Sequence, residues 1–187
     1  MSRRELGLLL LLTSVVIAGW WLQRPREGGE AGVHRGERRP DYVVEGIRGL
    51  VLDIDGLPDR RLNAQRLRHY PDDGSSELDE PVMIVYPDEG PPWRVRSRSA
   101  WINADADEVL LQQDVRVRRA KTPRMEAIEL RTSELRVLPQ QDYAETDRFV
   151  EIERGQDWLT SQQGLRAWLA DAIRAEFFGR VHARLEL

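Results

Sequence analysis

The chain has 187 residues, a formal net charge of −4 and no cysteine. These values exclude disulfides, thiolate metal sites and cysteine nucleophiles, and they give no sign of the basic face that nucleic-acid binding requires. The three histidines, at 34, 69 and 182, are scattered, and this argues against a zinc site.

An uncharged apolar segment covers residues 6–22, with Arg3 and Arg4 before it. Its 17 residues are at the short end of the range for a membrane-spanning helix. A cleavable signal peptide is the alternative, but no A-x-A-like cleavage site follows, and Trp20-Trp21 suits the headgroup interface. We therefore predict a single-pass anchor over residues 1–22, with the C-terminal domain outside the cytoplasm.

Residues 23–40 are rich in Gly, Arg and Glu and contain almost no apolar side chains, which predicts a flexible linker. The folded domain is expected to cover residues 41–187.

A pattern recurs four times in this domain. An aliphatic residue opens each unit, a second apolar residue follows five or six positions on, a polar turn comes next, and an apolar strand closes the unit. The opening residues are Leu62, Val95, Leu130 and Leu159, and the closing strands begin at Val82, Val115, Val150 and Val181. The opening-to-closing intervals of 20, 20, 20 and 22 residues indicate a tandem structural repeat.

The local period inside the units is mostly two, as in Val115-Arg-Val117 and Val150-Glu-Ile152. This alternation and the closely spaced turn residues predict short antiparallel strands in a sandwich or roll. The stretch 164–176 also has helical spacing of its apolar residues. We predict two strands there, joined near Ala170-Asp171, because the repeat register favours them, with a helix as the alternative.

One segment resembles a catalytic motif. Residues 49–56, with Asp53 and Asp55 after an apolar run, are similar to the first motif of haloacid-dehalogenase phosphatases. The catalytic lysine, the later acidic pair and the strand–helix alternation of that family are absent, so we interpret Asp53 to Gly56 as a hairpin turn. The acidic residues of 72–80 and 105–108 do not have EF-hand spacing and are interpreted as solvated turn acids.

The arrangement of anchor, linker and repetitive domain resembles the LptC family over the whole chain. The segments that carry the resemblance are Gly56 to Tyr70, Ser76 to Val82, and Arg131 to Asp147. The resemblance implies an all-β fold, an open β-jelly roll of stacked antiparallel strands in the periplasm, preceded by one N-terminal transmembrane helix.

The resemblance also implies a function. Proteins of this family accept lipopolysaccharide from the inner-membrane transporter LptB2FG and pass it to LptA along a transenvelope bridge. They hydrolyse nothing, so we expect no catalytic residue, no metal site and no cofactor.

Alternating strands can close into a roll with an apolar interior that accepts acyl chains. The candidate lipid-binding residues are Leu62, Leu78, Ile84, Val95, Leu111, Val117, Leu130, Val137, Ile152, Leu165 and Leu185. Ordinary core packing is the alternative role for each of them.

An open roll leaves strand edges that can add a partner strand. Tyr42 and Val44 mark the expected N-terminal edge, which by family similarity meets the transporter. The expected C-terminal edge meets LptA and contains Val181, Ala183 and Leu185. Gly56 and Gly164 match glycines of the family pattern and are interpreted as positions that need turn geometry or close approach.

Three hypotheses follow. The first is lipid transfer of the LptC type, and the second is a membrane-anchored β adaptor that only assembles strands. The third and most remote is a phosphatase that uses Asp53 and Asp55.

Overall fold

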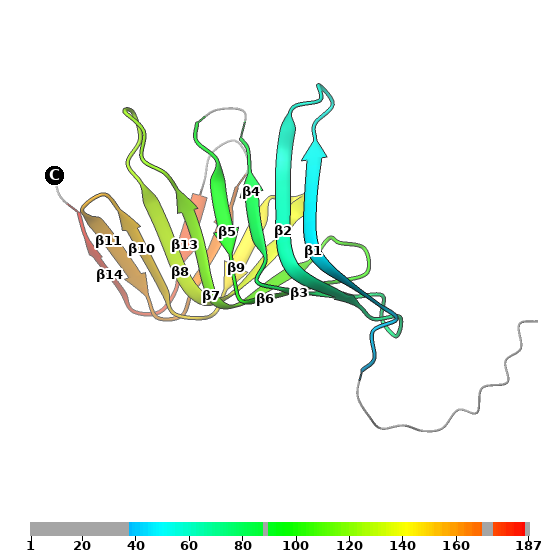
Figure 1. Ribbon diagram of the computed structural model, residues 1–187. Helices are drawn as coiled ribbons and strands as arrows, with labels where there is room; N and C mark the ends of the chain where they lie inside the picture. The colour runs from blue at the N-terminus through cyan, green and yellow to red at the C-terminus, as the bar shows by residue number, and fades with distance from the viewer. Residues whose placement is uncertain (1–37, 88–89, 170–173, 186–187) are drawn as a thin grey trace, which may run out of the picture. The chain divides into compact units, whose positions relative to one another are not determined.

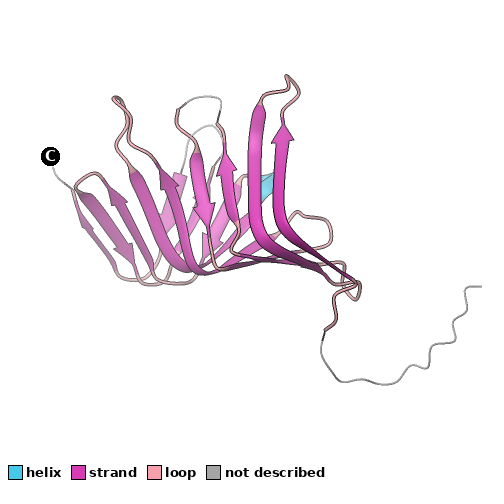
Figure 2. Ribbon diagram, in the orientation of Figure 1, coloured by secondary structure: helices cyan, strands magenta, loops and turns pink. Residues whose placement is uncertain are grey.

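The structure is a computed structural model that describes residues 38–87, 90–169 and 174–185. The expected anchor and linker up to residue 37, and the expected turn near Ala170-Asp171, lie outside these residues. Among the described residues no helix has the length and hydropathy needed to cross a membrane. Figure 2 shows a fold made almost entirely of strands, with one 3-10 turn at Pro139–Gln141.

All strand pairings are antiparallel, which confirms the expected all-β class. The fourteen strands are β1 Tyr42–Leu52, β2 Pro58–His69, β3 Ser76–Asp79, β4 Val82–Val85, β5 Trp93–Arg96, β6 Ser99–Ile102, β7 Val109–Arg119, β8 Ile128–Leu138, β9 Tyr143–Thr146, β10 Val150–Arg154, β11 Asp157–Ser161, β12 Leu165–Trp168, β13 Arg174–Phe177 and β14 Val181–Arg184.

The sheet is folded into two limbs that share their long strands. The front limb has the order β1-β2-β4-β5-β7-β8-β10-β11-β14, and the back limb has the order β1-β2-β3-β6-β7-β8-β9-β12-β13. β2 pairs with β4 through one half and with β3 through the other, and β7 divides in the same way between β5 and β6. In Figure 1 the front-limb strands stand side by side and turn at their lower ends into the back limb.

The bends lie where the backbone leaves ordinary strand geometry. In β7 the pairing with β8 shifts register between Gln112 and Val115, and Gln113 and Asp114 have φ of 62° and 50°. This is a β-bulge, which bends a strand and increases its twist. Glu80, with φ of 48°, occupies the corresponding bend between β3 and β4.

The fourfold repeat is confirmed by the topology. Each closing valine is the first residue after a bend. Val82, Val150 and Val181 begin β4, β10 and β14, and Val115 resumes β7 after its bulge. The opening residues also lie in front-limb strands, before the chain enters the back limb. Each unit therefore runs from the front limb to the back limb and returns.

Two local expectations are also confirmed. Residues 165–168 and 174–177 are strands, because each pairs along its length: β12 pairs with β9 and β13, and this pairing outweighs the helical spacing. The segment after β1 is a hairpin turn, in which the Asp53 carboxylate accepts hydrogen bonds from the Asp55 and Leu57 amides at 2.9 and 2.8 Å.

The core lies between the limbs close to the bend. One cluster centres on Leu78, Leu111 and Val115, and a smaller one on Val150 and Leu165. These residues are at most 8% exposed. Among the described residues, four of the eleven buried apolar residues are alanines, so small side chains make up a large part of the core.

Candidate functional site

An apolar row crosses the inner face of the front limb, which is the face that packs against the core. Residues directly opposite each other on neighbouring strands point to the same face. The register joins one residue from each of seven successive strands: Leu62, Met83, Val95, Val117, Leu130, Ile152 and Leu159. Each of the seven is half-buried, so the row is uninterrupted but incompletely covered.

The inner face of the back limb is apolar as well. One row consists of Leu67, Leu78, Ala100, Leu111 and Leu135, and the next of Ile102, Val109, Val137, Ala144 and Ala167. The side chains nearest the bend are buried, and Leu67, Ile102, Val109 and Val137 are half-buried. The two limbs therefore present facing apolar surfaces that are packed at the bend and accessible away from it.

Most of the predicted lipid-binding residues lie on this inner face. The register brings together nine of them: Leu62, Leu78, Val95, Leu111, Val117, Leu130, Val137, Ile152 and Leu165. Ile84 is separated from them, because it pairs with Arg61 and Arg94 and so shares the outer face with these cations. Leu185 follows the end of β14 and is 71% exposed.

The sequence reasoning missed Met83, which takes the inner-face position on β4. Its neighbours in the row are Leu62 and Val95. The strand Val82-Met-Ile-Val85 is apolar throughout and has no alternation, so its period cannot tell one face from the other. The paired strand β5, Trp93-Arg-Val-Arg96, does alternate. Once the pairing with β4 is known, this alternation shows which residues of β4 point to the inner face.

The outer face carries cross-strand ion pairs. In the back limb Arg136 lies directly opposite Glu145, at 2.8 Å, and also reaches Glu108 at 2.7 Å. Hydrogen bonds from Tyr143 and Arg136 lower the pKa of the Glu145 carboxyl. The contrast between a charged outer face and an apolar inner face shows which side of the sheet is adapted to water.

One cavity among the described residues does not coincide with the apolar rows. It has a volume of about 670 Å³ and lies at the bend. Its lining includes Arg48, Asn63, Val82 and Arg96, which form one outer row, and the charged residues Glu80, Arg98 and Asp114. The charged groups in its lining distinguish this cavity from the apolar rows, which remain the candidate surface for acyl chains.

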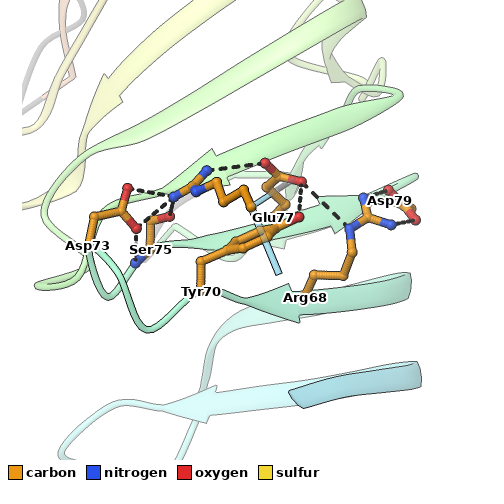
Figure 3. A network of polar contacts seen from close by, with 7 residues as sticks. Arg68, Tyr70, Asp73, Ser75, Glu77 and Asp79 are labelled. Atoms are coloured by element: carbon orange, nitrogen blue, oxygen red, sulfur yellow. Dashed lines mark hydrogen bonds and ion pairs between the residues drawn. The ribbon is translucent and has the colours of Figure 1, made fainter. Parts of the chain in front are cut away.

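A polar network joins the start of the domain to the turn after β2 (Figure 3). Arg38 binds the Asp73 carboxylate at 2.5 Å and the Ser75 hydroxyl at 2.5 Å, and its guanidinium lies 4.2 Å from the centre of the Tyr70 ring. The Tyr70 hydroxyl donates to Glu77 at 2.9 Å. These contacts attach the chain immediately before β1 to the back limb.

The same network sets the charge state of its carboxylate. Hydrogen bonds from Arg38 and from Ser75 lower the pKa of Asp73 to about 2. Asp73 is therefore ionised at any pH near neutrality. It belongs to the acidic stretch 72–80, where its partners are an arginine and a serine of the chain itself.

The N-terminal edge strand is long and apolar. Among the described strands β1 pairs with β2 alone. Its exposed large apolar residues are Tyr42, Val43, Val44, Leu50, Val51 and Leu52, each between 43% and 54% exposed. A row of unpaired backbone groups beside apolar side chains is a template for adding a strand.

The C-terminal edge is shorter. β14 pairs with β11, with Ala183 opposite Leu159 and Val181 opposite Ser161. Every residue of β14 is exposed. The structure thus places the predicted edge residues Tyr42 and Val44 on the part of β1 that belongs to the back limb. Val181 and Ala183 lie on the outermost strand of the front limb, with Leu185 directly after them.

The fold and these surfaces define a class of protein: a bent antiparallel roll of four tandem units with an apolar inner face and available strand edges that include β1 and β14. The model of one protein family, described as "Lipopolysaccharide-assembly, LptC-related", matches residues 6–186. The chain belongs to this family, which confirms the resemblance. No curated protein matches the chain.

Membership makes the chain a component of lipopolysaccharide transport and assembly in the cell envelope. The family is one of transport and assembly components and not of enzymes.

Proposed function

We propose that the chain accepts lipopolysaccharide from the inner-membrane transporter LptB2FG and passes it to LptA, holding the acyl chains against the inner apolar rows. The observation that carries the proposal is the uninterrupted, half-buried front-limb row from Leu62 to Leu159. An ordinary sandwich core would bury these residues fully, whereas here they retain surface that an acyl chain can cover. Each methylene buried there contributes about 0.8 kcal/mol.

The proposed lipid-facing set follows from the register. This set contains five of the residues predicted from the sequence, Leu62, Val95, Val117, Leu130 and Ile152. It also contains Met83 and Leu159, which the sequence reasoning did not name. Leu78, Leu111 and Leu165 are at most 8% exposed and form the packed floor near the bend. Ile84 lies on the outer face and serves as the natural control.

Two strand edges give this relay its direction. The exposed apolar strand β1 adjoins the N-terminal side of the chain, which favours it as the contact with the transporter. β14, at the opposite end of the front limb, is then the contact with LptA, and both would form by strand addition. In this arrangement residues 1–22 anchor the chain in the inner membrane as a single span, and the domain lies in the periplasm.

The matched variants Met83→Asp and Ile84→Asp test the proposal. They place the same charge on adjacent residues of β4 that point to opposite faces. Met83→Asp is expected to weaken lipopolysaccharide binding by the full chain in detergent at least tenfold, because an unpaired carboxylate is costly beside acyl chains. Ile84→Asp is expected to bind within about twofold of wild type, since its carboxylate meets Arg61 and Arg94.

Circular dichroism checks that both variants keep their strand content. Equal binding by the two variants would contradict lipid contact at the inner face. That result, with normal strand-to-strand assembly, would favour the adaptor that only joins partner proteins.

A further inference from the structure

Arg119 is a cation on the apolar inner face. It is the last residue of β7 and lies opposite Trp93 of β5 and Ile128 of β8. It is two positions after Val117, so it lies roughly 7 Å beyond the apolar row, toward the end of the front limb away from the bend. Its guanidinium carbon is 5.0 Å from the centre of the Trp93 ring.

The Arg119 side chain has unused hydrogen-bonding capacity. Its Nε is buried and has no hydrogen-bond partner, and it is the one such side-chain nitrogen or oxygen found among the described residues. A buried donor without an acceptor is unfavourable, so native proteins usually supply one. The contact with the Trp93 ring holds the guanidinium in place, so the group is positioned for an acceptor from outside the chain.

The surroundings of Arg119 on this face are cationic. The same inner row contains Arg60 on β2 and Arg154 on β10, about three strands and two strands away, or roughly 14 and 10 Å. Arg60 is bound by its neighbour Asp59 at 2.9 Å. Asp157, opposite Arg154, is the acidic member of the row. In the turn between β7 and β8, Lys121 and Glu126 pair with each other.

We propose that Arg119 binds a phosphate group on the headgroup of the lipid whose acyl chains lie along the inner rows. This inference rests on the proposed function and adds the residue that would bind the headgroup phosphate of the lipid. A guanidinium is always charged and presents a planar fork that fits phosphate oxygens. A lipid with its chains over Val117 and its headgroup toward the limb end would meet that fork directly.

The test compares two variants of the full chain in detergent. Arg119→Met keeps an unbranched apolar side chain over Trp93 and removes the charge. Arg118→Met is the matched control, because Arg118 is the preceding residue, points to the outer face and pairs with Glu129 at 3.1 Å. The probes are lipopolysaccharide, the same lipid after chemical removal of its phosphates, and inorganic phosphate.

Arg119→Met is expected to weaken binding of the phosphorylated lipid about tenfold to a hundredfold and to leave binding of the dephosphorylated lipid unchanged. Arg118→Met is expected to stay within about twofold of wild type for both lipids. Inorganic phosphate at millimolar concentration is expected not to displace the lipid; displacement would show a free-phosphate site and overturn the headgroup assignment.

The outcomes separate the two proposals. Failure of the wild type to bind either lipid would overturn the proposed function and this inference with it. The Arg119 assignment alone would be overturned if the wild type bound both lipids with equal affinity. It would also be overturned if Arg119→Met kept the wild-type preference for the phosphorylated lipid. If Arg119→Met does not fold, the Arg119 assignment is tested with Arg119→Lys and with the wild-type preference for the phosphorylated lipid. The lysine variant should lose affinity for that lipid only several-fold.

Discussion

Gly164 lies at the bend between β11 and β12, and its replacement by alanine is expected to remove most of the stability of the last unit. A Cβ added there would lie 1.7 Å from the Thr146 carbonyl oxygen, whereas real Cβ atoms essentially never come closer than 3.0 Å to another atom. The obstacle is backbone of β9, which pairs with β12 through Thr146 and Leu165. Relief of the clash therefore requires the two strands to separate.

Gly56 provides the matched comparison. Both glycines have positive φ, 79° at Gly56 and 87° at Gly164, so alanine pays a similar backbone cost of about 1–2 kcal/mol at either position. At Gly56, however, nothing lies within 4 Å of the added Cβ. Gly164→Ala should then cost at least 4 kcal/mol in total, in the range seen only for severe core defects, and Gly56→Ala only the backbone part.

Urea unfolding of the full chain in detergent, followed by circular dichroism, measures both costs. Gly164→Ala should shift the midpoint by a large fraction of a total stability of about 5–15 kcal/mol, or lose the transition altogether. The reasoning would be refuted if the two variants had equal stability, or if Gly164→Ala lay within 1 kcal/mol of wild type.

Three further predictions concern the core, the polar network and the N-terminal edge. Leu111→Ala, at a core residue that is 8% exposed, should cost about 3 kcal/mol in urea unfolding; a loss below 1 kcal/mol would contradict a packed floor at the bend. Asp73 has its pKa lowered to about 2 by Arg38 and Ser75 in the folded state, so its stabilising effect is present above about pH 4 and is lost as the pH falls toward 2. Asp73→Asn should therefore lose less stability than wild type on acidification, and an identical pH profile would show that the Arg38 contact adds nothing. Leu50→Lys places a charge on the β1 edge and should reduce co-purification of LptB2FG about tenfold, whereas Ile54→Lys, at a fully exposed turn residue, should not; equal recovery of the transporter would argue against strand addition at β1.

Much of the fold could be predicted from the sequence, because the spacing of the repeat matches the positions of the bends. Each closing valine marks the return to the front limb, at the start of a strand or, for Val115, directly after the bulge of β7. Its spacing from the opening aliphatic residue equals one passage through the back limb. The hairpin at Asp53 followed from turn chemistry alone. The strands at 165–168 and 174–177 were predictable only from the repeat, since their local spacing is that of a helix.

The site could be predicted in part. Alternation identified Val95 and Val117 as inner-face residues, because each lies between arginines on its own strand. It gave no information on β4, where every residue is apolar, so Ile84 could not be told from Met83 before the pairing with Arg61 and Arg94 was known.

Contacts that depend on tertiary pairing left no local sequence signal. Arg38 looks like one more charge of a polar linker, and only the folded turn brings it to Asp73. Arg119 likewise directly follows Arg118, and the pairing with β5 shows which of the two lies on the inner face.

The most direct test of lipid transfer along the inner rows is photocrosslinking in intact cells that make lipopolysaccharide. A photoreactive amino acid is placed at Val95 in one variant and at Arg94 in another, which are adjacent residues of β5 on opposite faces. The account predicts a lipopolysaccharide adduct at Val95 and none at Arg94. An adduct of equal strength at Arg94, or no adduct at Val95 while the protein still assembles with its partners, would contradict it.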